Sequence, residues 1–224
     1  YRRQMTPDSS EELPDEVRIA LAHTGESMRG ALTLFFELDA RLSRLVSASS
    51  EPLLGQVRMA WWRDTLILPA NERPGGDPIL DGIGAHMAGA EGAFIALVNG
   101  WEQMLSEPPL SREAASDFAL GRADGLVGLA AHHGFGGDVQ EDVRAAGFLW
   151  ALADAVSHIS DRDERQTLLN LAQEQQPPGR LPKPFRGLAV LAALSLRAIN
   201  AGGAPLMAGR AAGLVAFRAA LLGR

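Results

Sequence analysis

Two windows of the sequence place acidic side chains, in one case with a histidine, at spacings that could support metal chemistry. The first holds Glu37 and Asp39, and the second holds Asp154, His158 and Asp161. Carboxylates repeated on one helical face suit Mg²⁺, whereas histidine is typical of Zn²⁺ and other transition metals. Residues two apart point to different sides of a helix, so we do not expect the first pair to share an ion. The second trio can share a face, although His158 also fits a helix C-terminus, where a cation is favoured.

Basic and aromatic residues follow the first window. Arg41 and Arg44 continue the helical face of Glu37, and the four-residue spacing predicts an ion pair between Glu37 and Arg41 rather than half of a metal site. Arg58 precedes Trp62 by four residues, a spacing that favours stacking of the guanidinium on the indole. Contact between Arg58 and an anionic head group remains the alternative.

The composition excludes several classes of protein. The chain has 224 residues, 46% of them hydrophobic, with a formal net charge of -6 and no cysteine. The acidic balance argues against a protein that coats nucleic acid, and the lack of cysteine excludes disulfides and thiolate metal sites. The longest apolar run, at 187–196, is too short to cross a bilayer. The sequence also lacks a Walker phosphate loop, a Gly-x-Ser-x-Gly elbow and a His-Glu-x-x-His zinc motif.

The spacing of apolar residues predicts an all-α fold. Apolar side chains recur at three- and four-residue intervals, and no alternating β-branched run is long enough to indicate a sheet. We expect one domain over residues 1–224, with 1–13 as a flexible tail. Helices are predicted over residues 15–22, 26–46, 53–68, 77–88, 92–105, 111–133, 138–160, 166–176, 185–200 and 205–222.

Apolar stripes and glycines predict how these helices pack. The helix at 26–46 should face the core with Leu34, Phe35, Leu38, Leu42 and Leu45, and the helix at 53–68 with Leu53, Val57, Ala60, Trp61 and Leu68. In the helix at 111–133, glycines at 121, 125 and 128 lie four and three residues apart. Because glycine lacks a Cβ, this spacing indicates close approach of a neighbouring helix.

The stretch at 31–66 resembles the squalene/phytoene synthase family. The resemblance rests on an aromatic-rich helix followed by a helix with an Arg-Trp signature, here Arg58-Met-Ala-Trp61-Trp62-Arg63. The later segments GRADGLVG and AAGFLWALADAVSHIS also follow the family's order. The resemblance implies an isoprenoid synthase fold, in which antiparallel helices surround a deep apolar cavity. Two aspartate motifs face each other across its mouth and hold Mg²⁺ against prenyl diphosphates.

The sequence departs from the family's pattern at both motifs. The family's first aspartates would fall near Arg41 and Leu45, where a cation and an aliphatic side chain stand instead. In the second motif Asp154 takes an asparagine position, Ser157 an arginine position and His158 an aspartate position. The resemblance therefore implies a protein that has lost Mg²⁺-diphosphate catalysis and acts as a binding or assembly factor, similar to the family's complex I assembly factor branch.

Two alternatives remain open at this stage. One is an active head-to-head prenyltransferase that condenses two prenyl diphosphates with Mg²⁺ held by displaced carboxylates at 39, 154 and 161, and the other is a carrier of apolar ligands. For all three functions the candidate pocket-mouth residues are Glu37, Asp39, Arg41, Arg44, Arg58, Asp154, His158 and Asp161, and the candidate cavity-lining residues are Phe35, Trp62 and Trp150.

The expected partners and location follow from the leading interpretation. We predict no bound metal and no cofactor, with Mg²⁺ required only by the prenyltransferase alternative. The expected partner is another protein or an apolar, prenyl-type ligand, and neither nucleic acid nor a transmembrane segment is expected. The predicted location is cytoplasmic, with peripheral contact at the inner membrane left open.

Overall fold

The structure, a computed structural model, describes residues 12–49 and 51–224, and this part of the chain is all-helical. The all-α prediction is therefore confirmed for the described residues, whereas residues 1–11 of the predicted tail lie outside them. The helices are α1 (Asp15–His23), α2 (Glu26–Ala48), α3 (Pro52–Ile67), α4 (Pro78–His86), α5 (Glu91–Gln103), α6 (Arg112–His132), α7 (Asp138–His158), α8 (Arg162–Gln173), α9 (Arg186–Asn200) and α10 (Ala212–Leu222). Single turns of 3₁₀-helix lie at Ala70–Glu72 and Lys183–Phe185. No helix among the described residues is long and apolar enough to cross a membrane.

Two helices begin at places that the sequence did not predict. Helix α8 starts at Arg162 rather than at residue 166, because the Asp161 side chain accepts hydrogen bonds of 3.0 Å from the amides of Asp163 and Glu164. An N-cap of this kind satisfies donors that the first turn leaves unpaired. Helix α10 starts at Ala212 rather than at residue 205, and the segment before it contains Gly209 with a φ of +77°. That left-handed conformation cannot continue a helix.

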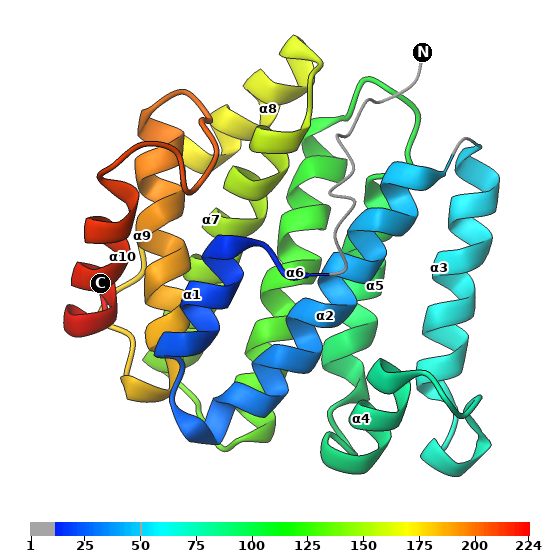
Figure 1. The fold of residues 1–224 in the computed structure, drawn as a ribbon. Coiled ribbons are helices and arrows are strands. Elements are labelled where there is room, and N and C mark those ends of the chain that lie inside the picture. Colours follow the sequence, from blue (N-terminus) through cyan, green and yellow to red (C-terminus); the bar gives the residue numbers. More distant parts are fainter. Residues whose placement is uncertain (1–11, 50) are drawn as a thin grey trace.

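Six helices form a row through the molecule, in the order α3, α5, α6, α7, α9 and α10 (Figure 1). Helices α5, α6 and α7 are the centre of the row, and α2 crosses in front of them against α5 and α6. Helices α3 and α10 stand at the two ends. An end helix packs along the row on one side only, so its other side has no neighbouring helix of the row.

The central helices approach each other closely through glycine. A Cβ placed on Gly121 of α6 would lie 2.5 Å from the Cα of Gly100 on α5, and one on Gly125 would lie 2.7 Å from the carbonyl oxygen of Ala93. Real atoms do not come this close, so both positions require glycine. The predicted tight packing of the glycine-containing helix is confirmed. It brings the side chains that flank these glycines into the middle of the protein.

The predicted inward face of α3 is wrong. Helix α3 packs on α5 with a face that includes Met59, Trp62 and Leu66, all buried. Four of the five residues expected to face the core are instead exposed, namely Leu53, Val57, Trp61 and Leu68. The error has a physical cause: α3 is apolar on two faces, and periodicity alone does not tell which of two apolar stripes meets the core.

Candidate functional site

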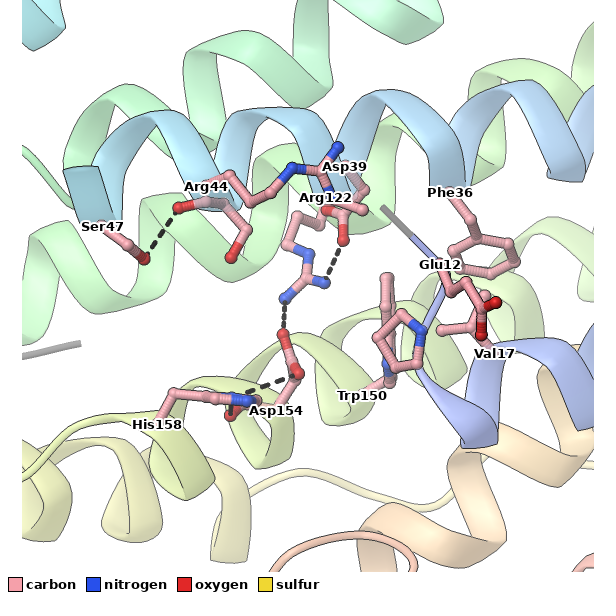
Figure 2. Close-up of a pocket in the computed structure, with 13 residues that line it drawn as sticks. Glu12, Val17, Phe36, Asp39, Arg44, Ser47, Arg122, Trp150, Asp154 and His158 are labelled. Atoms are coloured by element: carbon pink, nitrogen blue, oxygen red, sulfur yellow. Dashed lines mark hydrogen bonds and ion pairs between the residues drawn. The ribbon is translucent and has the colours of Figure 1, made fainter. Parts of the chain in front are cut away.

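The centre of the bundle holds a buried arginine between two carboxylates. Arg122 of α6, with only 1% of its surface exposed, donates from Nη2 to Oδ2 of Asp39 on α2 at 2.7 Å, and from Nη1 to Oδ2 of Asp154 on α7 at 2.9 Å. Figure 2 shows the guanidinium between the two acids, each of which comes from a different helix. Three helices are thereby joined through one cation.

Aromatic rings enclose this cluster. The guanidinium carbon of Arg122 lies 3.8 Å from the ring centroid of Trp150, 5.2 Å from that of Trp101 and 5.3 Å from that of Phe118. Trp101 of α5 also donates from Nε1 to Oδ1 of Asp39 at 2.8 Å. Cation–π attraction strengthens where water is excluded, so these rings both shield and stabilise the charge of Arg122.

The fold positions each member of the cluster for a local reason. Asp39 lies on the buried face of α2 with Phe35, Leu38 and Leu42, at helical spacing. Arg122 follows Gly121, whose close contact with Gly100 draws α6 against α5 and brings Arg122 beside Trp101. The cluster is therefore a consequence of tight helix packing rather than of flexible surface side chains.

Burial and the neighbouring charges shift the pKa values of Asp39 and Arg122. Burial raises the pKa of the Asp39 carboxyl, against the opposing attraction of Arg122. For Arg122, burial works in the direction of a lower pKa, but the charges of Asp39 and Asp154 outweigh it and raise the pKa, so the guanidinium stays protonated. Two carboxylates thus share a single permanent cation. Such a network is strongly coupled, and removing the arginine would leave two uncompensated acids.

A small cavity adjoins the cluster. Its volume is about 50 Å³, and Asp39, Arg122, Trp150, Asp154 and His158 are among the residues that line it. Ligand pockets usually enclose roughly 300 to 1,000 Å³, so this cavity accommodates a small number of water molecules rather than an isoprenoid chain. The space between the central helices is filled by Arg122 and by fully buried aromatic side chains, namely Phe35, Phe36, Trp101, Phe118 and Trp150.

The structure brings together half of the pocket-mouth candidates. Asp39, Arg44, Asp154 and His158 line the same small cavity. Glu37 and Arg41 line a shallow neighbouring groove, which Arg44 shares. The other two are elsewhere: Arg58 is exposed on α3, and Asp161 caps α8. Of the three cavity-lining candidates, only Trp150 borders the small cavity, where Phe36 lies in place of Phe35.

Two predicted pairings are wrong. Arg41 pairs with Asp77, the N-cap of α4, at 2.8 Å rather than with Glu37. Arg41 is also the cation that lies over the Trp62 ring, with 6.0 Å between the guanidinium carbon and the centroid. The predicted stacking of Arg58 fails because Arg58 points to solvent while Trp62 is buried against α5. Spacing within one helix did not show that α4 would supply the partner of Arg41.

The donor set of the central cluster does not fit a divalent metal. Mg²⁺ requires near-octahedral oxygen coordination, and both oxygens of Asp39 already accept hydrogen bonds, from Trp101 and from Arg122. Among residues 12–49 and 51–224, no group of three or more histidine, aspartate or glutamate side chains is arranged to hold a metal ion. The positive charge between the two carboxylates is that of Arg122.

Sequence reasoning missed Arg122, the residue on which the site depends. The segment GRADG contributed its glycines and its place in the family's order to the predictions, but its arginine was not singled out. A signal was present, because Arg122 stands between small residues on a helix that the glycine spacing predicted to pack closely against a neighbour. Arginine is almost never fully buried unless it is paired, so its position implied acidic partners on neighbouring helices.

Comparison of the chain with family models, with curated proteins and with solved structures finds no match.

Proposed function

We propose that this protein is a squalene/phytoene synthase-like helical bundle that has exchanged Mg²⁺-diphosphate catalysis for a role as a binding or assembly factor. The observation that carries the proposal is the position of Arg122 between Asp39 and Asp154. In the proposed ancestry, carboxylates on two facing helices would have held metal ions, and here a guanidinium occupies the space between them.

A permanent internal cation changes what such a bundle can do. Metal-dependent catalysis needs carboxylates that are free to bind a cation when substrate arrives. Here both carboxylates already bind the permanent cation Arg122, through charge-assisted hydrogen bonds of the kind that make arginine–carboxylate pairs strong. The cluster joins α2, α6 and α7 without any ligand. This arrangement supports a structural role for the former metal region.

The binding role is assigned to the exposed apolar face of α3. Leu53, Val57 and Trp61 follow each other at four-residue spacing, with Leu53 exposed to 68% and Trp61 to 46%. Exposed apolar side chains in a row are typical of protein interfaces, in which tryptophan often dominates the binding energy. Charges of both signs lie on and beside the helix, at Glu51, Arg58 and Asp64. We infer that the occupant of this face is an apolar surface of a partner protein.

One observation favours the prenyltransferase alternative, and another argues against the carrier of apolar ligands. Asp39 and Asp154 do come from two helices and do converge, as a two-motif metal site would require. If Mg²⁺ and diphosphate displaced Arg122, both carboxylates would become available. A carrier is less well supported, because the space between the central helices is occupied by aromatic side chains.

The catalytic question can be tested with farnesyl diphosphate and Mg²⁺. We expect no Mg²⁺-dependent release of diphosphate above a protein-free control, and no shift in melting temperature when Mg²⁺ is added. The variant Asp154→Ala should behave like the wild type in the diphosphate assay, as should Asp64→Ala on the surface. Mg²⁺-dependent release that disappears in Asp154→Ala but persists in Asp64→Ala would establish the prenyltransferase instead.

The binding surface can be tested by site-specific crosslinking in cells. A photoreactive amino acid in place of Trp61 should give a discrete adduct with another protein, and this adduct should be lost in the Leu53→Ser, Val57→Ser double variant. The same reactive group in place of Glu113, exposed on α6, is the control position and should give no such adduct. An adduct with a second copy of this chain, or one unchanged by the double variant, contradicts the proposal.

A further inference from the structure

Helix α10 stands at the other end of the helix row (Figure 1), and its outer face exposes a second apolar stripe. Leu214, Phe217 and Leu221 lie at three- and four-residue spacing and are exposed to 71%, 60% and 68%. The opposite face, with Ala212, Ala216 and Ala219, is buried and packs on α9. Small alanines hold α10 to the bundle while the large side chains point outward, which is the reverse of an ordinary surface helix.

In the segment that carries this stripe, every charged side chain is basic. Residues 175–224 contain seven of the 21 lysines and arginines and none of the 27 acidic residues. The seven cations are Arg180, Lys183, Arg186, Arg197, Arg210, Arg218 and Arg224. All 27 acidic residues lie before residue 175, so the C-terminal segment is basic and the rest of the chain is acidic.

The cations lie at both ends of α10 and beside its apolar stripe. Arg180 donates to the carbonyl of Leu222 at 3.1 Å and Arg186 to that of Leu221 at 2.8 Å, which holds two guanidinium groups at the C-terminal end of the helix. Arg210 precedes the helix, Arg224 follows it, and Arg218 is exposed next to Phe217. Among the described residues, Arg210, Arg218 and Arg224 form no ion pair.

We propose that α10 docks this protein on the surface of an anionic lipid membrane. An interfacial helix buries leucine and phenylalanine at the boundary of head groups and acyl chains while arginines on its flanks contact lipid phosphates. On α10 the residues that would enter the lipid are Leu214, Phe217 and Leu221. The arginines that would contact the phosphates are Arg210, Arg218 and Arg224. The acidic rest of the molecule is repelled by the same membrane, so the charge asymmetry orients the protein with α10 towards the lipid.

The same charges argue against a second copy of the chain as the occupant. A symmetric dimer through α10 would place the stripe of one copy on the stripe of the other, and the flanking arginines would face each other without an acidic partner. The face of α3 differs in this respect, because acidic and basic side chains both lie near it. The docking of α10 does not depend on the function proposed for α3.

Co-sedimentation with lipid vesicles tests the proposal. The full chain should bind vesicles of phosphatidylcholine mixed with phosphatidylglycerol, bind phosphatidylcholine alone weakly, and lose binding as salt is raised. Replacing Arg218 or Arg210 by glutamine should weaken binding about fivefold for each cation removed. The double variant Phe217→Ser, Leu221→Ser should weaken it at least about tenfold.

The face of α3 provides the matched control. The double variant Leu53→Ser, Val57→Ser removes exposed apolar side chains of similar size from the other end of the row and should leave vesicle binding unchanged. Circular dichroism melting of every variant separates loss of binding from loss of fold. The proposal is overturned if the wild type does not bind anionic vesicles, if the α3 control weakens binding as much as the α10 variants, or if Phe217→Ser instead abolishes a dimer seen by gel filtration.

Discussion

The centre of the bundle and its two outer helices depart from the usual distribution of side chains in opposite directions. Around Arg122 the cation and Asp39 are buried, Asp154 is partly buried, and each has a partner. On α3 and α10, large apolar side chains are exposed at the ends of the helix row. Proteins seldom bury arginine without partners and seldom expose contiguous apolar patches without a binding role. The two regions therefore have different roles: the central cluster joins three helices of the bundle, and the outer apolar residues are available to contact other molecules.

The largest expected effect comes from removing the central cation. The variant Arg122→Ala should lose about 3 to 5 kcal/mol of unfolding free energy, because it leaves the buried Asp39 and the partly buried Asp154 without their shared partner. Urea denaturation followed by circular dichroism measures the loss. The exposed Arg58 is the control, and Arg58→Ala should change stability by less than about 0.5 kcal/mol. Similar losses in the two variants would show that the central cluster is not a folding element.

The sequence predicted the helices well because their apolar periodicity is local. Asp39 and Asp154 were singled out as acidic residues, but the sequence did not indicate that both meet Arg122, since that contact joins three helices far apart in the chain. The face of α3 was assigned wrongly for a related reason. Both of its stripes are apolar, and only the position of α3 at the end of the row decides which of them is exposed. Prediction therefore failed where tertiary neighbours, rather than helical spacing, determine the environment.

The next largest loss of stability should come from disturbing the close packing of α5 and α6, which positions Arg122. The variant Gly121→Ala puts a Cβ 2.5 Å from the Cα of Gly100, and we expect a loss of about 1 to 3 kcal/mol because backbone on both sides must shift. Gly30 on α2 is the matched control, since nothing lies within 4 Å of a Cβ placed there. Gly30→Ala should gain about 0.5 to 1 kcal/mol from helix propensity. Thermal and urea unfolding of the pair distinguish the two outcomes, and equal gains would contradict the tight contact.

A smaller effect should appear in the pH dependence of stability. Burial raises the pKa of Asp39 in the folded state, so the folded protein holds this proton more strongly than the unfolded chain does. Stability from Asp39 is therefore greatest below the unfolded pKa of about 3.9 and is lost as pH rises through the raised folded pKa. In urea unfolding at a series of pH values above about 4, wild type should lose stability relative to Asp39→Asn as pH rises. A difference that stays constant or grows with pH would contradict the raised pKa.

The smallest effect on stability is expected at the exposed face of α3. Replacing Leu53 and Val57 together by serine should change the unfolding free energy by no more than about 0.5 kcal/mol per site, because these side chains are mostly exposed to solvent. Met59, buried on the opposite face of the same helix, provides the contrast, since Met59→Ala should cost about 2 to 5 kcal/mol. If the serine variant is instead destabilised as strongly as Met59→Ala, Leu53 and Val57 are packed in solution. The face of α3 would then belong to the fold, and the distinction between a central folding element and outer binding surfaces would fail at α3.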